Sequence, residues 1–315
     1  MYHVIMNPAS RSGKGNQLWQ ELEAVLKAQN AEYTTHFTTQ AGDAKRFVEE
    51  LTGAEGTEPV SLLVMGGDGT LNEAIQGIRN LERTRFYYVP TGSGNDFARD
   101  YIEKGKPAER LARLLQNPHE YHTDLGVLQY CDENGKEQKF YFAVSAGIGF
   151  DAAVCAEVDK SKWKPRFNKI GLGKLVYLAI ALRNLMTIPD VSCKLQLEDE
   201  KGNRTEVTRK SFIFAAMMNH KYEGGGFMFA PQADAEDGLL DLCLVENMSK
   251  LKILRVIPTA FKGNHVKFKE VYMKKCRSIH IRADEALYIH SDGEVPGKAK
   301  ELTLSCMKQA LTLYL

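Results

Sequence analysis

The stretch SLLVMGGDGTLNEAIQG, residues Ser61 to Gly77, decides the fold class because it joins a strand signal to a helix signal through glycine. Four apolar residues lead into two glycines, Asp68, a third glycine and Thr70, after which an amphipathic pattern begins. Glycine-rich turns between a strand and a helix usually hold phosphate, because backbone N–H groups and the helix N-terminus attract an anion. A carboxylate would repel a phosphate, so Asp68 in this loop needs an explanation. A purely structural explanation is that Asp68 caps the helix.

The same alternation runs through the first third of the chain. Strand signals at residues 2–6, 31–37, 61–65 and 85–90 are separated by helical periods. This order predicts a parallel sheet with helices on both faces and with ligands at the carboxyl ends of the strands. Three polar loops are expected at that edge: NPASRSGKG from Asn7, GGDGT from Gly66 and PTGSGND from Pro90.

After Asp124 the pattern changes to short apolar runs separated by polar turns, including an Asn-Gly pair within Glu133–Lys136. Many short strands at regular spacing predict a β-sandwich or barrel, which two helical stretches interrupt at residues 172–186 and 250–261. We therefore expect an α/β domain over residues 1–125, with residues 306–315 as candidates to complete it, and an all-β domain over residues 126–305.

Composition narrows the class of protein. The chain has 315 residues, a formal net charge of +1 and 26% charged residues, so nothing global indicates nucleic-acid binding. Its six cysteines show no metal-binding spacing and are typical of a reduced, cytoplasmic protein. The first residues do not resemble a signal peptide, and no apolar run is long enough to span a membrane. We expect a soluble protein.

The polar loops differ in how strongly they indicate a phosphate site. The first contains Gly-Lys-Gly but lacks the P-loop spacing, so ordinary turn chemistry remains an equal alternative. The third repeats the glycines and hydroxyls of the second and ends in Asn95 and Asp96. Two such loops at neighbouring strand ends predict a nucleotide site.

Taken in order, these motifs resemble the diacylglycerol kinase catalytic domain family, bacterial soluble lipid kinases related to sphingosine and ceramide kinases and more distantly to NAD kinases. GGDGTLNEAIQG and PTGSGNDFARD carry the resemblance, followed by GIGFDA (147–152), DAEDGLLDL (234–242) and SDGE (291–294). GGDGT alone is shared with NAD kinases, whereas GSGNDFAR favours lipid kinases. Gln76 departs from the asparagine that the family often carries.

The resemblance implies a Rossmann-like α/β domain, a C-terminal β-sandwich and a nucleotide cleft between them. Asp68 would act through Mg²⁺, since a carboxylate and a phosphate can share a divalent cation, and Asp96 and Asp124 would be further carboxylates of the cleft. The implied ATP-site residues are Asn7, Ser10, Thr39, Gly66, Gly67, Asp68, Gly69, Thr70, Leu71, Asn72 and Thr91.

Two further acidic sites follow from the resemblance, and each has a plainer alternative. Glu294 would be the general base, although Asp292-Gly293-Glu294 could equally be a hairpin turn. Asp234, Asp237 and the Leu239 carbonyl would hold a structural Mg²⁺, although DAEDG could be a solvated acidic turn.

The lipid side is indicated by two stretches. KSKWKPRFNKIGLGK, from Lys160 to Lys174, interleaves basic side chains with Trp163 and Phe167, which favours contact with an anionic membrane. A solvated loop and a nucleic-acid site are its alternatives. HKYEGGGFMFAP (220–231) would be a substrate entrance or a tight loop.

We therefore predict an ATP- and Mg²⁺-dependent lipid kinase that phosphorylates the free hydroxyl of diacylglycerol or a related lipid, giving phosphatidic acid or an analogue. It would work in the cytoplasm at the inner face of the membrane, without nucleic-acid partners, and a homodimer is left open. The alternatives are an NAD-kinase-like enzyme with a soluble acceptor and a catalytically inactive nucleotide-binding regulator.

Overall fold

A computed structural model describes residues 1–8, 15–92, 94–101, 105–160, 180, 183–184 and 190–315. The chain divides into two compact units. Unit 1 consists of residues 1–124 and 309–315, and unit 2 consists of residues 125–308. Ser10, the helical stretch predicted at residues 172–186, apart from residues 180, 183 and 184, and the basic segment from residue 161 onward lie outside the described residues.

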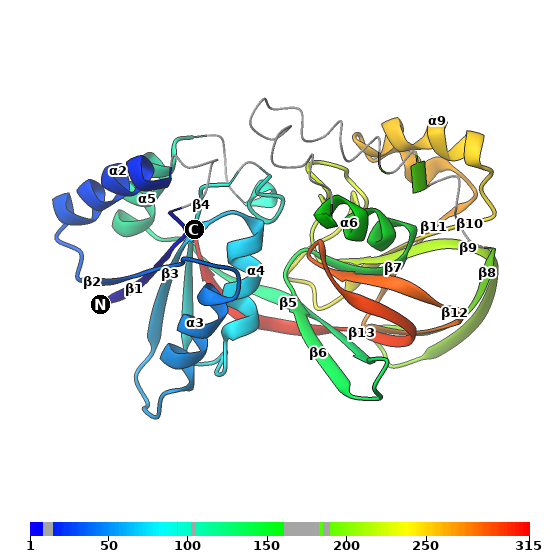
Figure 1. Ribbon diagram of the computed structural model, residues 1–315, viewed down its shortest axis with the longest axis horizontal. Coiled ribbons are helices and arrows are strands. Elements are labelled where there is room, and N and C mark those ends of the chain that lie inside the picture. Colours follow the sequence, from blue (N-terminus) through cyan, green and yellow to red (C-terminus); the bar gives the residue numbers. More distant parts are fainter. Residues whose placement is uncertain (9–14, 93, 102–104, 161–179, 181–182, 185–189) are drawn as a thin grey trace. The chain divides into compact units, whose positions relative to one another are not determined.

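Unit 1 is built on a parallel sheet (Figure 1). Its strand order is β13-β4-β3-β1-β2, and every neighbouring pair is parallel. The strands are β1 (Tyr2–Met6), β2 (Tyr33–Phe37), β3 (Val60–Gly66), β4 (Thr84–Pro90) and the end of β13 (Glu294–Tyr314). The predicted α/β part of the fold is confirmed.

Helices cover this sheet in two pairs (Figure 1). Helices α2 (Gly15–Ala28) and α5 (Pro107–Gln116) pack together and share one apolar core with β1, β3 and β4. Helices α3 (Asp43–Gly53) and α4 (Asp68–Gly77) form the second pair, and a Cβ on Gly77 would lie 2.4 Å from the Lys45 carbonyl oxygen. A short 3₁₀ helix, η1 (Phe97–Asp100), follows β4.

Unit 2 is rich in antiparallel strands, with the order β11-β10-β9-β7-β12-β13 and with β8 paired to both β9 and β12. Most of its core lies between these strands, as the predicted all-β part requires. The strands are β5 (Glu120–Cys131), β6 (Glu137–Phe142), β7 (Ser145–Gly149), β8 (Val191–Glu198), β9 (Arg204–Met218), β10 (Leu240–Glu246), β11 (Val271–Cys276) and β12 (Ser278–Ser291).

Two helices and a 3₁₀ turn accompany these strands in unit 2. They are α6 (Phe150–Lys160), α9 (Lys250–Ala260) and η2 (Asn264–Lys267). Helix α9 contributes Ile253 and Val256 to a second apolar cluster with β9 and β10. Unit 2 therefore has two separate apolar clusters, one between its strands and one beside α9.

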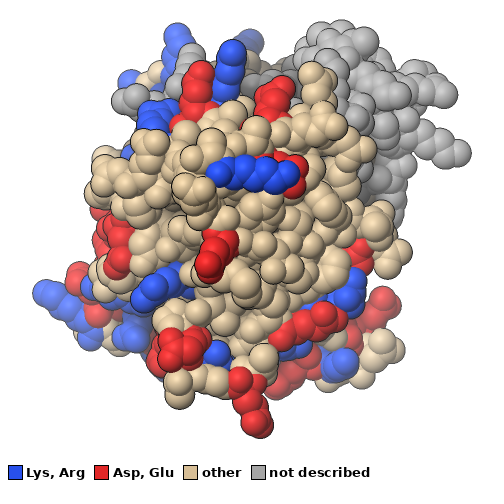
Figure 2. Space-filling model, turned by 90° about the vertical axis from the view of Figure 1, so that its left-hand side faces the viewer, with Lys and Arg blue, Asp and Glu red and all other residues tan. Residues whose placement is uncertain are grey.

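Charged side chains are dispersed on the face of the molecule that Figure 2 presents. Basic and acidic residues alternate there around a largely uncharged centre, with no single sign prevailing among the described residues in view. Within the described part of the chain, no helix is both long enough and apolar enough to cross a membrane.

Candidate active site

The GGDGT loop is a tight turn between β3 and α4. Strand β3 ends at Gly66, Gly67 is the helix N-cap in an extended conformation, and Asp68 is the first helical residue. Asp68 is therefore not the capping residue, which removes the plainest alternative for its presence. A Cβ on Gly66 would lie 2.4 Å from the Cβ of Thr70, so a side chain at Gly66 would collide with Thr70.

The second and third glycine loops are in backbone contact. The Thr91 N–H donates to the Gly66 carbonyl at 2.8 Å, and a Cβ on Gly92 would lie 2.6 Å from the Gly67 Cα. A Cβ on Gly94 would lie 2.9 Å from Oδ2 of Asp68. The Asp68 carboxylate thus faces a position where the chain has no side chain, and the two loops form one site.

A buried tyrosine, Tyr88, forms a hydrogen bond to the backbone of this loop. Tyr88 is 1% exposed, and its hydroxyl donates to the Gly66 carbonyl at 3.3 Å. Burial and the nearby charge of Asp68 raise the pKa of Tyr88 well above its ordinary value. The phenol therefore stays protonated and remains a hydrogen-bond donor under the loop.

Other predicted nucleotide residues of unit 1 lie around these loops in different environments. Thr91 and Asn72 are buried, and Asn7 is half-buried directly after β1. The N–H and the hydroxyl of Thr39 both donate to Oδ2 of Asp43 at 2.8 Å, and these bonds lower the pKa of Asp43 to about 2. Thr39 thereby fixes the start of α3. The position of Asp43 at the predicted helix start could have indicated this contact from the sequence.

The two further carboxylates have structural contacts. Asp96 is buried at the N-terminus of η1, and its Oδ1 lies 3.4 Å from Nε of Arg99. Asp124 is fully buried, and its Oδ1 accepts the Gln309 N–H at 2.6 Å. Asp124 therefore holds the C-terminal segment within unit 1.

Glu294 follows a tight turn between β12 and β13. Asp292 and Gly293 have φ values of 51° and 84°, and Ser291 pairs with Glu294 across the turn. The Asp292 carboxylate accepts three backbone N–H groups, from residues 143, 144 and 145, at 2.8 to 3.0 Å. The predicted hairpin turn exists, and Glu294 lies exposed at its exit.

Asp237 of the DAEDG loop forms an ion pair with Lys275 of β11. Asp237 pairs through Oδ2 with the Lys275 ammonium, while its Oδ1 accepts the Leu239 N–H at 2.9 Å. Lys275 also lies 3.6 Å from Asp241, and among the described residues no cluster of three His, Cys, Asp or Glu side chains could hold a metal ion. This arrangement does not fit a resident divalent ion, because the Lys275 ammonium already brings to Asp237 the positive charge that such an ion would supply.

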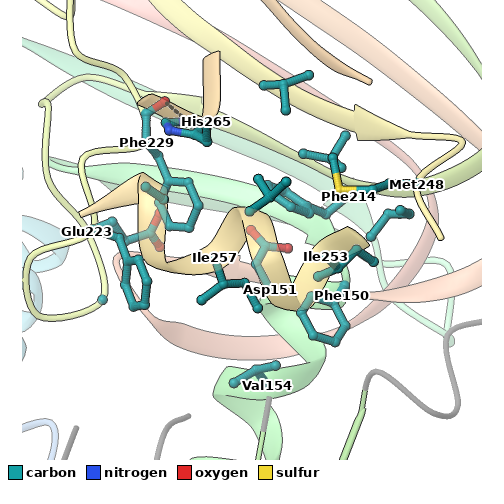
Figure 3. A pocket seen from close by; sticks show the side chains of 17 residues that line it. Phe150, Asp151, Val154, Phe214, Glu223, Phe229, Met248, Ile253, Ile257 and His265 are labelled. Carbon is teal, nitrogen blue, oxygen red and sulfur yellow. Dashed lines mark hydrogen bonds between the residues drawn. The ribbon is translucent and has the colours of Figure 1, made fainter. Parts of the chain in front are cut away.

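Unit 2 contains an apolar cavity of about 110 Å³ beside α9 (Figure 3). Phe227 and Phe229, from the predicted substrate-entrance stretch, are among its lining residues. Aliphatic side chains of α9, including Ile253 and Ile257, form another wall. The cavity therefore offers a shaped apolar environment suited to hydrocarbon.

Two acidic side chains line this otherwise apolar cavity and contact a buried histidine. His290 is completely buried, with Nε2 3.0 Å from Oδ2 of Asp151 and Nδ1 3.5 Å from Oε1 of Glu223. Both carboxylates line the cavity. Burial alone would lower the pKa of His290, but the charges of Glu223 and Asp151 outweigh it and raise that pKa to about 9. We call Asp151, Glu223 and His290 the charged triad.

The sequence prediction did not identify this triad. Asp151 lies in the quoted GIGFDA motif and Glu223 in the glycine-rich stretch, but no local spacing connects them to His290. A histidine two residues before Asp292 was the only available signal.

Comparison with known proteins agrees with this architecture. Residues 1–127 match the diacylglycerol kinase catalytic domain, and residues 143–315 match the YegS C-terminal NAD kinase beta sandwich-like domain. The chain is 28% identical over 291 residues to a diacylglycerol kinase of Mycobacterium tuberculosis, covering 92% of this chain and 87% of the relative. It is 27% identical to a diacylglycerol kinase of Bacillus subtilis, covering 93% and 89%.

Similarity to solved structures extends over the same length. The crystal structure of a diacylglycerol kinase from Bacillus anthracis aligns with a TM-score of 0.67 at 20% identity, covering 99% of this chain and 95% of that one. At this identity the likeness shows the fold.

Proposed function

The chain belongs to the family of diacylglycerol kinase-like lipid kinases, which are phosphotransferases, and from that premise we propose that it transfers the γ-phosphoryl group of ATP to a free hydroxyl of diacylglycerol or a related lipid. The observation that carries the proposal is the apolar cavity of unit 2, which is lined also by the two acidic members of the charged triad. A cavity of this kind suits an amphiphile, whose hydrocarbon needs apolar walls and whose head needs hydrogen-bond acceptors.

The nucleotide phosphates would lie at the paired glycine loops of unit 1. Their backbone N–H groups and the N-terminus of α4 are donors for phosphate oxygens, and the glycines allow close approach. Residues 66–72 and Thr91 would make these contacts. This assignment agrees with the backbone contact between the loops at Gly67 and Gly92.

Asp68 fits the role of a Mg²⁺ ligand. Its Oδ2 lies so close to Gly94 that a side chain there would collide with it, so the position of the carboxylate depends on that glycine. Mg²⁺ is usually held by one or two carboxylates together with substrate phosphates and water. When bound, the ion would neutralise charge on the transferring phosphoryl group.

Glu294 would accept the proton from the lipid hydroxyl. The three N–H groups that bind Asp292 fix the turn that presents Glu294. His290 of the triad lies on the same hairpin, four residues earlier, so one member of the triad and the proposed base belong to one element. A lipid with its head at the triad would therefore have its hydroxyl in the same region as Glu294.

The triad would recognise the head of the lipid. Among the described residues, buried Oδ1 of Asp151 has no hydrogen-bond partner, while Oδ2 is bound to His290. A water molecule bound between that oxygen and the lipid head would satisfy it, whereas its isolation costs about 1–3 kcal/mol. Phosphatidic acid or an analogue would be the product.

The test is transfer of label from radiolabelled ATP to a panel of acceptors, namely diacylglycerol, monoacylglycerol, phosphatidylglycerol, a sphingoid base and NAD. We expect Mg²⁺-dependent labelling of diacylglycerol or a related lipid. Glu294→Gln should lower turnover by about 10² to 10⁴, the usual contribution of a general base, with ATP binding retained. Glu285→Gln changes an exposed acid on β12 and is the matched control.

Two outcomes would contradict the proposal. Unchanged turnover of Glu294→Gln would remove this residue as the base. Labelling of NAD in place of every lipid would show that the acceptor is soluble and that the cavity serves another purpose.

A further inference from the structure

Helix α9 has two apolar faces, and only one of them lines the cavity. Ile253, Val256 and Ala260 are buried on the cavity side. The opposite side, which we call the outer face of α9, consists of Leu251, Leu254, Arg255 and Pro258, four exposed residues spaced three or four apart. Such a helix has more apolar surface than unit 2 covers.

The exposure on the outer face is concentrated. Leu251 is 73% exposed, Leu254 39%, and Phe261, directly after the helix, 45%. These are three of the five large hydrophobic side chains that are exposed in the described part of the chain. Single exposed hydrophobic side chains are ordinary, but two leucines and a phenylalanine within eleven residues form a patch.

The same segment carries a strong positive excess. No acidic residue occurs between residues 249 and 269, and Glu270, which follows, pairs with Lys252 at 2.7 Å. Arg255 on the outer face and Lys262 beside it are exposed. The basic residues of the segment are Lys250, Lys252, Arg255, Lys262, Lys267 and Lys269.

The outer face is connected to the cavity by aromatic contacts. Phe261 stacks on Phe227 with ring centroids 4.1 Å apart, and Phe227 stacks on Phe229 at 5.7 Å. Both Phe227 and Phe229 line the cavity. An apolar path therefore leads from the exposed patch into the interior of unit 2.

We propose that the outer face of α9 docks the protein on an anionic lipid bilayer, with the leucines and Phe261 among the acyl chains and the basic side chains at the headgroups. Exposed apolar side chains next to Lys and Arg, without acids, are complementary to such a surface. The choice of a bilayer as occupant rests on the proposed lipid kinase function, since the cavity on the other side of the helix would receive the lipid.

This surface is distinct from the basic segment predicted at Lys160–Lys174. It is carried by described residues of another element, and its apolar component consists of the exposed side chains of Leu251, Leu254 and Phe261. Variants of the two segments can therefore be tested separately.

The experiment is sedimentation of the full chain with phosphatidylcholine vesicles that contain or lack phosphatidylglycerol. Arg255→Gln with Lys262→Gln should weaken binding to anionic vesicles by about thirtyfold, from about 1 kcal/mol per basic residue. Leu251→Ser with Leu254→Ser should weaken the binding that persists at high salt. Lys201→Gln with Lys300→Gln removes two exposed charges elsewhere in unit 2 and should leave binding unchanged.

A second measurement keeps a failure of this proposal separate from a failure of the proposed function. Kinase activity is compared on vesicles and on short-chain diacylglycerol dispersed in detergent. We expect the α9 variants to lose far more activity on vesicles than on the dispersed lipid. A wild-type protein that phosphorylates neither form would count against the kinase function, whereas the vesicle sedimentation tests docking by itself.

Two results would overturn the docking proposal. If both α9 variants sediment with anionic vesicles as strongly as the wild-type protein does, this face does not contact the bilayer. A change from dimer to monomer in the leucine variant, with vesicle binding retained, would show that the face is covered by a second copy of the chain.

Discussion

His290 is a residue whose charge depends on its neighbours. Its ring is fully buried and lies between Asp151 and Glu223, and its pKa is raised to about 9 from an ordinary value of 6.5. A group with a higher pKa in the folded state stabilises that state in its protonated form. The stabilisation is complete below pH 6.5 and is lost as the pH rises through 9.

We therefore expect the free energy of unfolding to fall between pH 6.5 and 9 by an amount on the order of 3 kcal/mol, from the size of the pKa shift. Urea unfolding at a series of pH values measures it. His290→Gln should be less stable at pH 6 and should lack this pH dependence. If the free energy of unfolding of the variant falls with pH as much as that of the wild-type protein, another group is responsible for the titration.

At the scale of residues, the sequence predicted the features that neighbouring residues determine, such as turns, but not the contacts between distant residues. Asp68 and Glu294 each follow a turn that neighbouring glycines indicate, and in the structure Asp68 begins α4 directly after Gly67 and Glu294 begins β13 directly after the Asp292-Gly293 turn. The pairing of Asp237 with Lys275 could not be inferred, because 38 residues separate the two. The same holds for the triad, which joins residues 151, 223 and 290 through the fold alone.

The β12–β13 hairpin is the element that presents Glu294, and Asp292 fixes it to the segment before β7. Besides accepting three N–H groups there, Asp292 donates its own N–H to the Ser145 carbonyl at 2.7 Å. A carboxylate bound by several backbone N–H groups cannot be replaced without leaving those donors unsatisfied. The turn conformation should therefore depend on this side chain.

We expect Asp292→Ala to lower turnover at least tenfold with little change in the KM for ATP, and to lower the free energy of unfolding by about 1–3 kcal/mol. Steady-state kinetics and urea unfolding measure the two effects. Ser291→Ala removes one neighbouring bond, from the Ser291 hydroxyl to the Tyr141 carbonyl, and is the control. A loss in Asp292→Ala no larger than in this control would contradict the positioning role.

Elements were predicted better than their pairing. The strands and helices of unit 1 follow from apolar periods that are local in sequence, and β1 to β4 form where those periods are. The long strand β13 could not be predicted in full, since its 21 residues include charged and glycine positions that pairing with β12, β5 and β4 keeps extended.

At the scale of the whole molecule, unit 1 is discontinuous, because unit 2 is inserted between its residues 124 and 309. The returning segment pairs with β4 from Thr312 to Tyr314, and Leu311 and Leu313 are fully buried. Tyr314 stacks on Tyr87 with centroids 4.5 Å apart. These contacts complete the core of unit 1.

Deleting residues 309–315 should therefore destabilise unit 1 selectively. Loss of two buried leucines alone corresponds to roughly 4–10 kcal/mol, from typical values for Leu→Ala. Hydrogen exchange should show lost protection in β3 and β4 while β9 and β12 stay protected. Gln309→Ala keeps the backbone bond to Asp124 and is the control. Equal loss of protection in both units would show that they unfold together.

The insertion also sets an order for events on the ribosome. Residues 309–315 are translated only after all of unit 2, so the sheet of unit 1 lacks its β13 edge throughout the synthesis of 184 intervening residues. Nascent chains usually fold their first domain first, as it emerges. Of the two units, the one that begins to emerge first is completed last, so β4 lacks its β13 partner until residues 309–315 emerge.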